Sequence, residues 1–233
     1  MKKFLTLLLI SGLWFNLMGQ EVKLNTNLVV ESDGTLRMDG NATAFTDLVV
    51  PVTAVRLGSG NSPQFVSMKN NGSGSRGVYT FTFENQSSSS NEQEVFFSIQ
   101  LPHNWKEGTT IYPHVHWSPQ TATTGVVVWG FEYSWVEYNA STPIAFPNTV
   151  LETVSSAAIG VGDVDKHFIT PFSAITPTAD QDKISGIIMC RFWRKSADAA
   201  DTYGGGGTGN AALLSFDVHY EMDGIGSHTE YVK

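Results

Sequence analysis

Two histidines lie one residue apart in the segment EGTTIYPHVHWSPQ, residues 107–120. If this segment is a β-strand, alternate side chains project from the same face, and His114 and His116 lie about 7 Å apart along the backbone. At that spacing both imidazoles can reach one divalent ion. The pair is therefore a candidate metal site, and its remaining ligands have to come from another part of the chain.

The pattern of Gly108, five intervening residues and His-x-His resembles the opening of the cupin metal motif. The resemblance is incomplete, because Gln120 stands where the motif has a glutamate, and an amide is a weaker ligand than a carboxylate. No second motif with its own histidine follows. The late segment 212–222 offers further ligands on one face of a predicted strand: Asp217, His219 and Glu221. The alternative is that these side chains form ordinary hydrogen bonds on an exposed sheet face or at a subunit interface.

Four aromatic residues alternate within VVVWGFEYSWVEY, residues 126–138. If this face is exposed, Trp129, Tyr133 and Trp135 form a candidate carbohydrate-binding surface. Strict alternation of aromatic residues is more typical of a core face. Cys190 lies in an apolar run, which favours a buried thiol over a nucleophile. No Gly-x-Ser-x-Gly elbow occurs. The sequence therefore favours a non-enzymatic protein without a cofactor, and a single bound divalent metal ion is the alternative.

The elements that would position these residues show a period of two, bounded by Gly, Pro, Asn and Ser. This pattern predicts six strands, at 78–83, 95–101, 111–118, 126–138, 184–193 and 212–222, and a weaker one around 167–170. Short strands separated by turn-rich segments are typical of a β-sandwich or jelly roll. We therefore expect an all-β fold, a single jelly-roll-like sandwich of antiparallel strands.

The same pattern predicts which face of each strand is buried. In the last strand we expect Leu214, Phe216, Val218 and Tyr220 to point inward. The mostly apolar run 184–193 is consistent with a strand buried on both faces. The segment 195–210 contains four consecutive glycines and is predicted to be a mobile hairpin tip.

Composition and the N-terminus indicate the compartment and the class of partner. The 233 residues carry a net charge of −8, which disfavours nucleic acid as a partner. Residues 1–19 have the layout of a cleaved signal peptide, so no stable membrane span is expected after cleavage. Residues 20–60 are expected to form N-terminal strands and a linker, and residues 61–233 the sandwich. A single cysteine excludes an internal disulfide, so stability has to come from the core and from oligomerisation.

Several stretches resemble a family of uncharacterised tailed-bacteriophage structural proteins: 101–117, 126–138, 201–233 and, more weakly, 40–52. The resemblance covers about half of the chain and implies a virion-associated β-rich protein without catalysis. It implies self-association into a homo-oligomer, for which a trimer is one candidate, and contact with other surface or virion proteins. The leader departs from that family, because phage particles assemble in the cytoplasm. It favours export to the periplasm or cell surface, with the virion as the alternative location.

Overall fold

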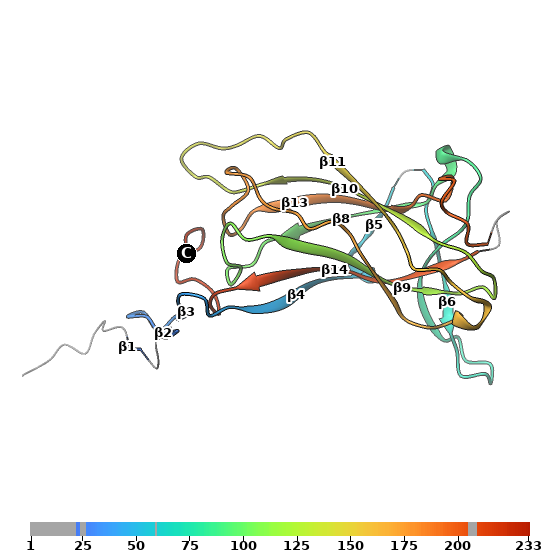
Figure 1. Cartoon of the computed structure of the whole chain (residues 1–233), viewed down its shortest axis with the longest axis horizontal. Helices are drawn as coiled ribbons and strands as arrows, with labels where there is room; N and C mark the ends of the chain where they lie inside the picture. The colour runs from blue at the N-terminus through green and yellow to red at the C-terminus, as the bar shows by residue number, and fades with distance from the viewer. Residues whose placement is uncertain (1–21, 24–26, 59, 205–208) are drawn as a thin grey trace, which may run out of the picture.

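The computed structural model of the chain describes residues 22–23, 27–58, 60–204 and 209–233 (Figure 1). The predicted leader, residues 1–19, lies outside the described residues. The fold is all-β, with two antiparallel sheets packed face to face, so the predicted sandwich is confirmed. Within the described residues, no helix has the length and apolar character needed to cross a membrane.

The first sheet has five strands in the order β11-β10-β13-β8-β5. Its members are β5 (Arg56–Leu57), β8 (Glu94–Gln100), β10 (Val128–Val136), β11 (Val150–Ser155) and β13 (Ile187–Arg194). The second sheet has six strands, in the order β12-β9-β14-β7-β6, with β4 also paired to β14. Its members are β4 (Ala44–Pro51), β6 (Gln64–Lys69), β7 (Val78–Phe83), β9 (Ile111–Pro119), β12 (Phe168–Pro171) and β14 (Ala211–Met222).

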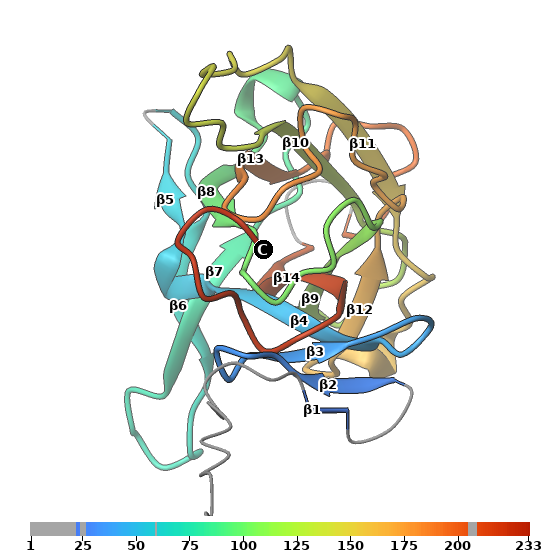
Figure 2. The ribbon, with the colours of Figure 1, turned by 90° about the vertical axis from the view of Figure 1, so that its left-hand side faces the viewer.

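The eight strands from β7 to β14 pair in a nested order, the first with the last. β7 pairs with β14, β8 with β13, β9 with β12 and β10 with β11. This wrapping, which places alternate pairs in opposite sheets, is the topology of a jelly roll. Figure 2 shows the two layers end on, with β11, β10, β13 and β8 above and β12, β9, β14 and β7 below.

Short elements complete the chain. A three-stranded sheet of β1 (Val22–Lys23), β2 (Leu28–Val30) and β3 (Leu36–Met38) lies beside the C-terminal segment. The backbone N–H of Met38 donates to the carbonyl of Asp223, which joins the two ends of the described chain. In the described part of the chain, three single-turn 3-10 helices occur in loops: η1 (Val52–Ala54), η2 (Ser89–Asn91) and η3 (Val161–Asp163).

The space between the two sheets is filled by aromatic side chains. Trp129 stacks on Phe192 with ring centroids 5.0 Å apart, and Trp117 meets Trp129 edge-on at 5.6 Å. Phe216 of β14 contacts Phe131 of β10 at 4.8 Å, so rings from both sheets interdigitate. These rings are buried in one continuous core. Because the interior is packed, a site that admits a ligand has to lie on the surface of the sandwich.

Two predicted faces are corrected by the structure. A β-bulge between Leu213 and Ser215 adds one residue to β14, so Leu213 is buried in the core while Leu214 is only partly buried. Beyond the bulge, Phe216, Val218 and Tyr220 point inward as predicted. β13 is not buried on both faces, because Met189 on its outer face is 50% exposed.

Gly130 of β10 permits a close approach that any other residue would block. The indole of Trp193 lies against the Gly130 backbone, and a Cβ at residue 130 would come within 2.4 Å of its ring atoms. Trp193 is thereby buried on the outer face of the five-stranded sheet, where a tryptophan would otherwise be exposed. The guanidinium of Arg191 packs 4.0 Å from the centre of the Trp193 ring.

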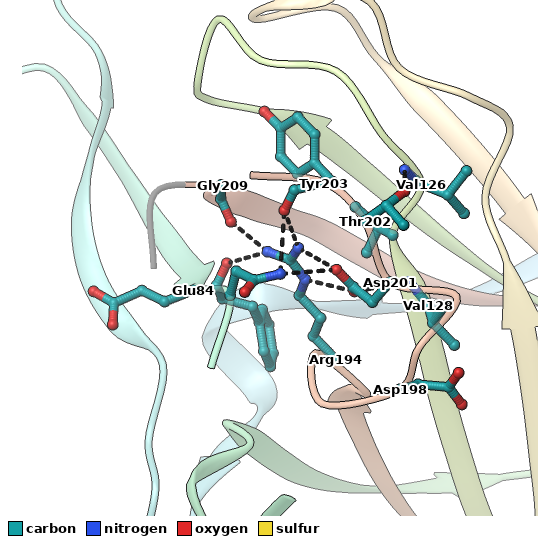
Figure 3. A network of polar contacts seen from close by, with 12 residues as sticks. Glu84, Val126, Val128, Arg194, Asp198, Asp201, Thr202, Tyr203 and Gly209 are labelled. Carbon is teal, nitrogen blue, oxygen red and sulfur yellow. Dashed lines mark hydrogen bonds and ion pairs between the residues drawn. The ribbon is translucent and has the colours of Figure 1, made fainter. Parts of the chain in front are cut away.

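The loop that follows β13 is anchored by a fully buried charge, Arg194 (Figure 3). Its Nε and Nη2 donate to the two carboxylate oxygens of Asp201, at 2.9 and 2.7 Å. Its remaining N–H groups donate to the carbonyls of Tyr203, Phe83 and Gly209. All five donors of the guanidinium therefore have acceptors.

This network shows how the flanks of the predicted mobile tip, residues 195–210, are held, while the mobility of the tip itself stays a prediction. Asp201 also accepts a hydrogen bond from the backbone N–H of Val128 at 3.0 Å, which ties the loop to β10. The flanks of the glycine run are thus pinned to the sandwich. Residues 205–208, at the predicted tip, lie outside the described residues.

Candidate metal centre

The histidines of β9 lie on the outer face of the six-stranded sheet. Along this strand Val115 and Trp117 are fully buried in the core, so His114 and His116 point the other way and are partly exposed. The predicted alternation is confirmed. Whether these histidines share one site depends on the neighbouring strands.

Strand register brings a carboxylate to the histidines. β9 pairs with β14 so that Asp217 lies directly opposite His114, and Ser215 lies opposite His116. One ligand atom each from His114, His116 and Asp217 all lie within 4.8 Å of one another. Asp217 is buried, and its Oδ1 has no hydrogen-bond partner among the described residues. A buried carboxylate oxygen without a donor is costly unless a cation or a proton occupies the site.

The ring nitrogens are oriented for this arrangement. The Nε2 of His116 lies 3.3 Å from the Asp217 Oδ2. The Nδ1 of His114 lies 3.3 Å from the carbonyl oxygen of Tyr112, which favours protonation of Nδ1 and leaves Nε2 as the ligand nitrogen. The candidate ligand nitrogens of both histidines are then Nε2 atoms.

A third histidine, His167, lies against the other side of His116. Its Nε2 is 2.7 Å from the Nδ1 of His116, and the two rings stack with centroids 4.9 Å apart. His167 comes immediately before β12, which pairs with β9 and places Ile169 opposite His116. It can accept the Nδ1–H of His116, the outer-shell hydrogen bond that fixes the tautomer of a metal-ligating histidine. The sequence pattern did not single out His167 as a site residue, although it is the first residue of the segment 167–170 that was predicted to be a strand.

Burial and two neighbouring histidines favour the neutral form of His116. Burial lowers its pKa below the usual range; Asp217 and Asp47 oppose this, while His114 and His167 add to it. The neutral imidazole is the form that binds a metal. Two imidazoles and one carboxylate, with a position open to solvent, are a ligand set of zinc and of non-haem iron sites.

Two of the predicted ligands are not brought into this cluster. His219 lies opposite Tyr112, donates from its Nδ1–H to the Oδ1 of Asp47 at 2.7 Å and stacks on Phe45 at 5.0 Å. Glu221 is paired with Lys106 at 2.9 Å. Both share the outer face of β14 with Asp217, as predicted, but each has a partner of its own.

The aromatic residues of the candidate carbohydrate-binding surface lie in the core. Trp129, Tyr133 and Trp135 are all buried between the sheets and cannot contact a glycan. A carbohydrate site on this chain has to use other side chains. Cys190 is also buried, and burial raises the pKa of its thiol well above the usual range, so it remains protonated and unreactive.

No protein-family model and no curated protein matches the sequence. Among solved structures, the chain is similar to an isomalto-dextranase of Arthrobacter globiformis solved with panose (13% identity, TM-score 0.37), covering 74% of this chain and 23% of that one. It is also similar to TmCBM61 solved with β-1,4-galactotriose (12%, 0.29; 77% and 88% covered). A third is a candidate glycoside hydrolase of Bacteroides thetaiotaomicron (10%, 0.28; 87% and 78% covered). All three TM-scores are below 0.5, so these similarities carry no argument about function. The resemblance to phage structural proteins stays a prediction.

Proposed function

We propose that the protein binds one divalent transition-metal ion, with Zn²⁺ as the best fit, through His114, His116 and Asp217. The observation that carries this proposal is the convergence of three ligand atoms within 4.8 Å around a buried Asp217 oxygen that lacks a hydrogen-bond donor among the described residues. Ligands about 2.0–2.2 Å from a tetrahedral zinc ion lie about 3.3–3.6 Å apart, so side-chain rotations that bring the ligand atoms closer by roughly an ångström complete the site. The ion would join β9 to β14 on the outer face, and its fourth position would face solvent.

Equilibrium dialysis against Zn²⁺ in chelator-free buffer, with metal content measured by mass spectrometry, tests this proposal. We expect one equivalent of zinc in the wild-type protein and none in His116→Gln or Asp217→Asn. His167→Ala retains the ligands but loses the orienting contact, so we expect it to bind about 10–100-fold more weakly.

His219→Gln is the matched control, because His219 lies on the same face of β14 and outside the cluster. It should bind zinc like the wild type. Sub-stoichiometric zinc in the wild-type protein, or equal loss of zinc in His219→Gln, rejects the three-ligand site.

A second candidate function is surface assembly through self-association. It is favoured by the apolar side chains around the cluster on the outer face of the six-stranded sheet. Four large apolar side chains flank the cluster and are between 42% and 54% exposed: Phe45, Val49, Tyr112 and Ile169. Single exposed apolar residues are ordinary, but several gathered on one face form an apolar patch, which is typical of an interaction surface. A side chain from a second copy could then occupy the fourth position.

Sedimentation velocity at increasing protein concentration, with Zn²⁺ and with chelator, measures this association. We expect a zinc-dependent oligomer that Val49→Glu and Ile169→Glu both disrupt. Leu151→Glu, on the outer face of the other sheet, should leave it intact. A strict monomer at high concentration under both conditions contradicts the assembly function and leaves zinc binding standing.

A further inference from the structure

A groove of about 560 Å³ lies on the outer face of the five-stranded sheet, on the opposite side of the sandwich from the metal cluster. Its volume lies within the range of about 300–1,000 Å³ typical of small-molecule sites. Its floor is built by outward side chains of β8, β13 and β10, whose alternate residues Phe97 and Cys190 face the core. Ala54 and Arg56 form one rim, and Thr149 forms the other.

The register places polar and apolar groups side by side across the floor. Glu132 lies opposite Arg191, Arg191 lies opposite Phe96, and Phe96 lies opposite Arg56. In the adjacent row, Met189 lies between Ser134 and Ser98. The floor therefore offers one planar charged pair beside an aromatic ring and a thioether.

The charged pair is held rigidly. Arg191 donates from Nε to Glu94 at 2.5 Å and from Nη1 to Glu132 at 3.2 Å, and it packs on Trp193. Glu132 also accepts a hydrogen bond from the Thr149 hydroxyl at 2.7 Å. That bond and Arg191 lower the pKa of Glu132, so the carboxylate is ionised. The bonds to Glu94 and Glu132 use two of the five guanidinium donors, which leaves N–H groups that a ligand in the groove can engage.

This combination selects a chemical class of ligand. A planar guanidinium and a carboxylate fixed side by side recognise adjacent hydroxyl groups, one as donor and the other as acceptor. The exposed surfaces of Phe96 and Met189 accept an apolar C–H face. A pyranose ring presents both features. Glu94 and Glu132 together balance the charges of Arg191 and of Arg56 on the rim, so the groove carries no excess positive charge that would favour an anionic ligand.

We propose that this groove binds a short neutral oligosaccharide. The site is separate from the metal cluster, so its test is run in chelator and is independent of zinc. The probes are maltotriose, cellotriose and β-1,4-galactotriose, with trigalacturonic acid as the acidic comparison, after a neutral-glycan array has ranked further candidates. Binding is measured by calorimetry.

We expect saturable binding of at least one neutral oligosaccharide. Ser98→Trp, which fills the groove without removing a partner of any residue, should abolish that binding. Arg191→Met should weaken it by at least about tenfold, because hydrogen bonds to a charged group are lost. Leu151→Ala, exposed on the same sheet face beyond Glu132, is the control and should bind like the wild type.

Three outcomes overturn the proposal: no saturable binding to any neutral glycan on the array, unchanged binding in Ser98→Trp, or tighter binding of the acidic trisaccharide. Thermal melts of each variant establish that it is folded. If Arg191→Met fails to fold, Ser98→Trp, whose substituted side chain is exposed, still decides between the outcomes.

Discussion

Asp201→Ala is expected to destabilise the protein by about 3–5 kcal/mol, because it leaves Arg194 as an uncompensated buried charge. Both side chains of the pair are fully buried. The change also removes the acceptor for the backbone N–H of Val128 and for the Asn85 amide. Urea denaturation followed by tryptophan fluorescence measures the free energy of unfolding.

Asp198→Ala provides the control for this prediction. Asp198 lies in the same loop and pairs with Lys195 at 3.1 Å, but its carboxylate is about a third exposed. Its loss should therefore cost at most about 1 kcal/mol. Equal destabilisation by the two changes would show that the loop, rather than the buried charge, sets the effect.

Arg194→Lys separates the charge from the geometry. A lysine keeps the charge facing Asp201 but has three donors on one nitrogen, and it cannot reach the carbonyls of Phe83, Tyr203 and Gly209 together. Each buried carbonyl left without a donor costs about 1–3 kcal/mol. We therefore expect a clear loss of stability in the same denaturation measurement, with the ion pair retained.

Most strands and their buried faces could be predicted, because a strand with one buried face has apolar side chains at alternate residues. Trp129 to Trp135 on β10 and Val115 and Trp117 on β9 follow that pattern and lie in the core. Leu214 does not, because the bulge beside it shifts the alternation by one residue, and nothing local in the run of apolar residues marks the bulge. Met189 is exposed because its face of β13 is the groove floor rather than a second core.

The candidate metal centre could be predicted only in part, since one sequence does not contain the register between strands. His114, His116 and Asp217 were all candidates, and the pairing that puts Asp217 opposite His114 decides among the three residues proposed on β14. His219 and Glu221 are displaced by two and four residues along the same face. His167 reaches the cluster because β9 pairs with β12, a contact that only the nested jelly-roll order predicts.

The burial of Arg194 could not be predicted from its sequence neighbours, for a different physical reason. An arginine at the end of a strand, before a loop rich in Asp and Gly, is usually solvated. Its burial depends on two features of the fold (Figure 3). The loop after β13 turns back so that Asp201, seven residues later, meets the guanidinium, and carbonyls of β7 and of Gly209 accept its remaining N–H groups. Such convergence is a property of the closed sandwich.

Zinc should raise the thermal stability of the protein, because an ion that binds only the folded state shifts the unfolding equilibrium by mass action. At a free Zn²⁺ concentration 100 times the dissociation constant, the gain is about 2.7 kcal/mol. For a chain of this size that corresponds to an increase in Tm of about 5–10 °C. Differential scanning calorimetry with zinc and then with excess EDTA measures the change and its reversal.

The same experiment on variants distinguishes the proposed site from zinc bound elsewhere on an acidic surface. His116→Gln removes the central ligand, so zinc should leave its Tm unchanged, whereas His219→Gln should show the full wild-type increase. The ligands must be deprotonated to bind. Because burial lowers the pKa of His116, the zinc-dependent increase should persist to a pH below about 6.5, the ordinary pKa of histidine, and be lost at more acidic pH. An increase that survives in His116→Gln would place the bound zinc away from β9 and β14 and would remove the physical basis for the proposed function.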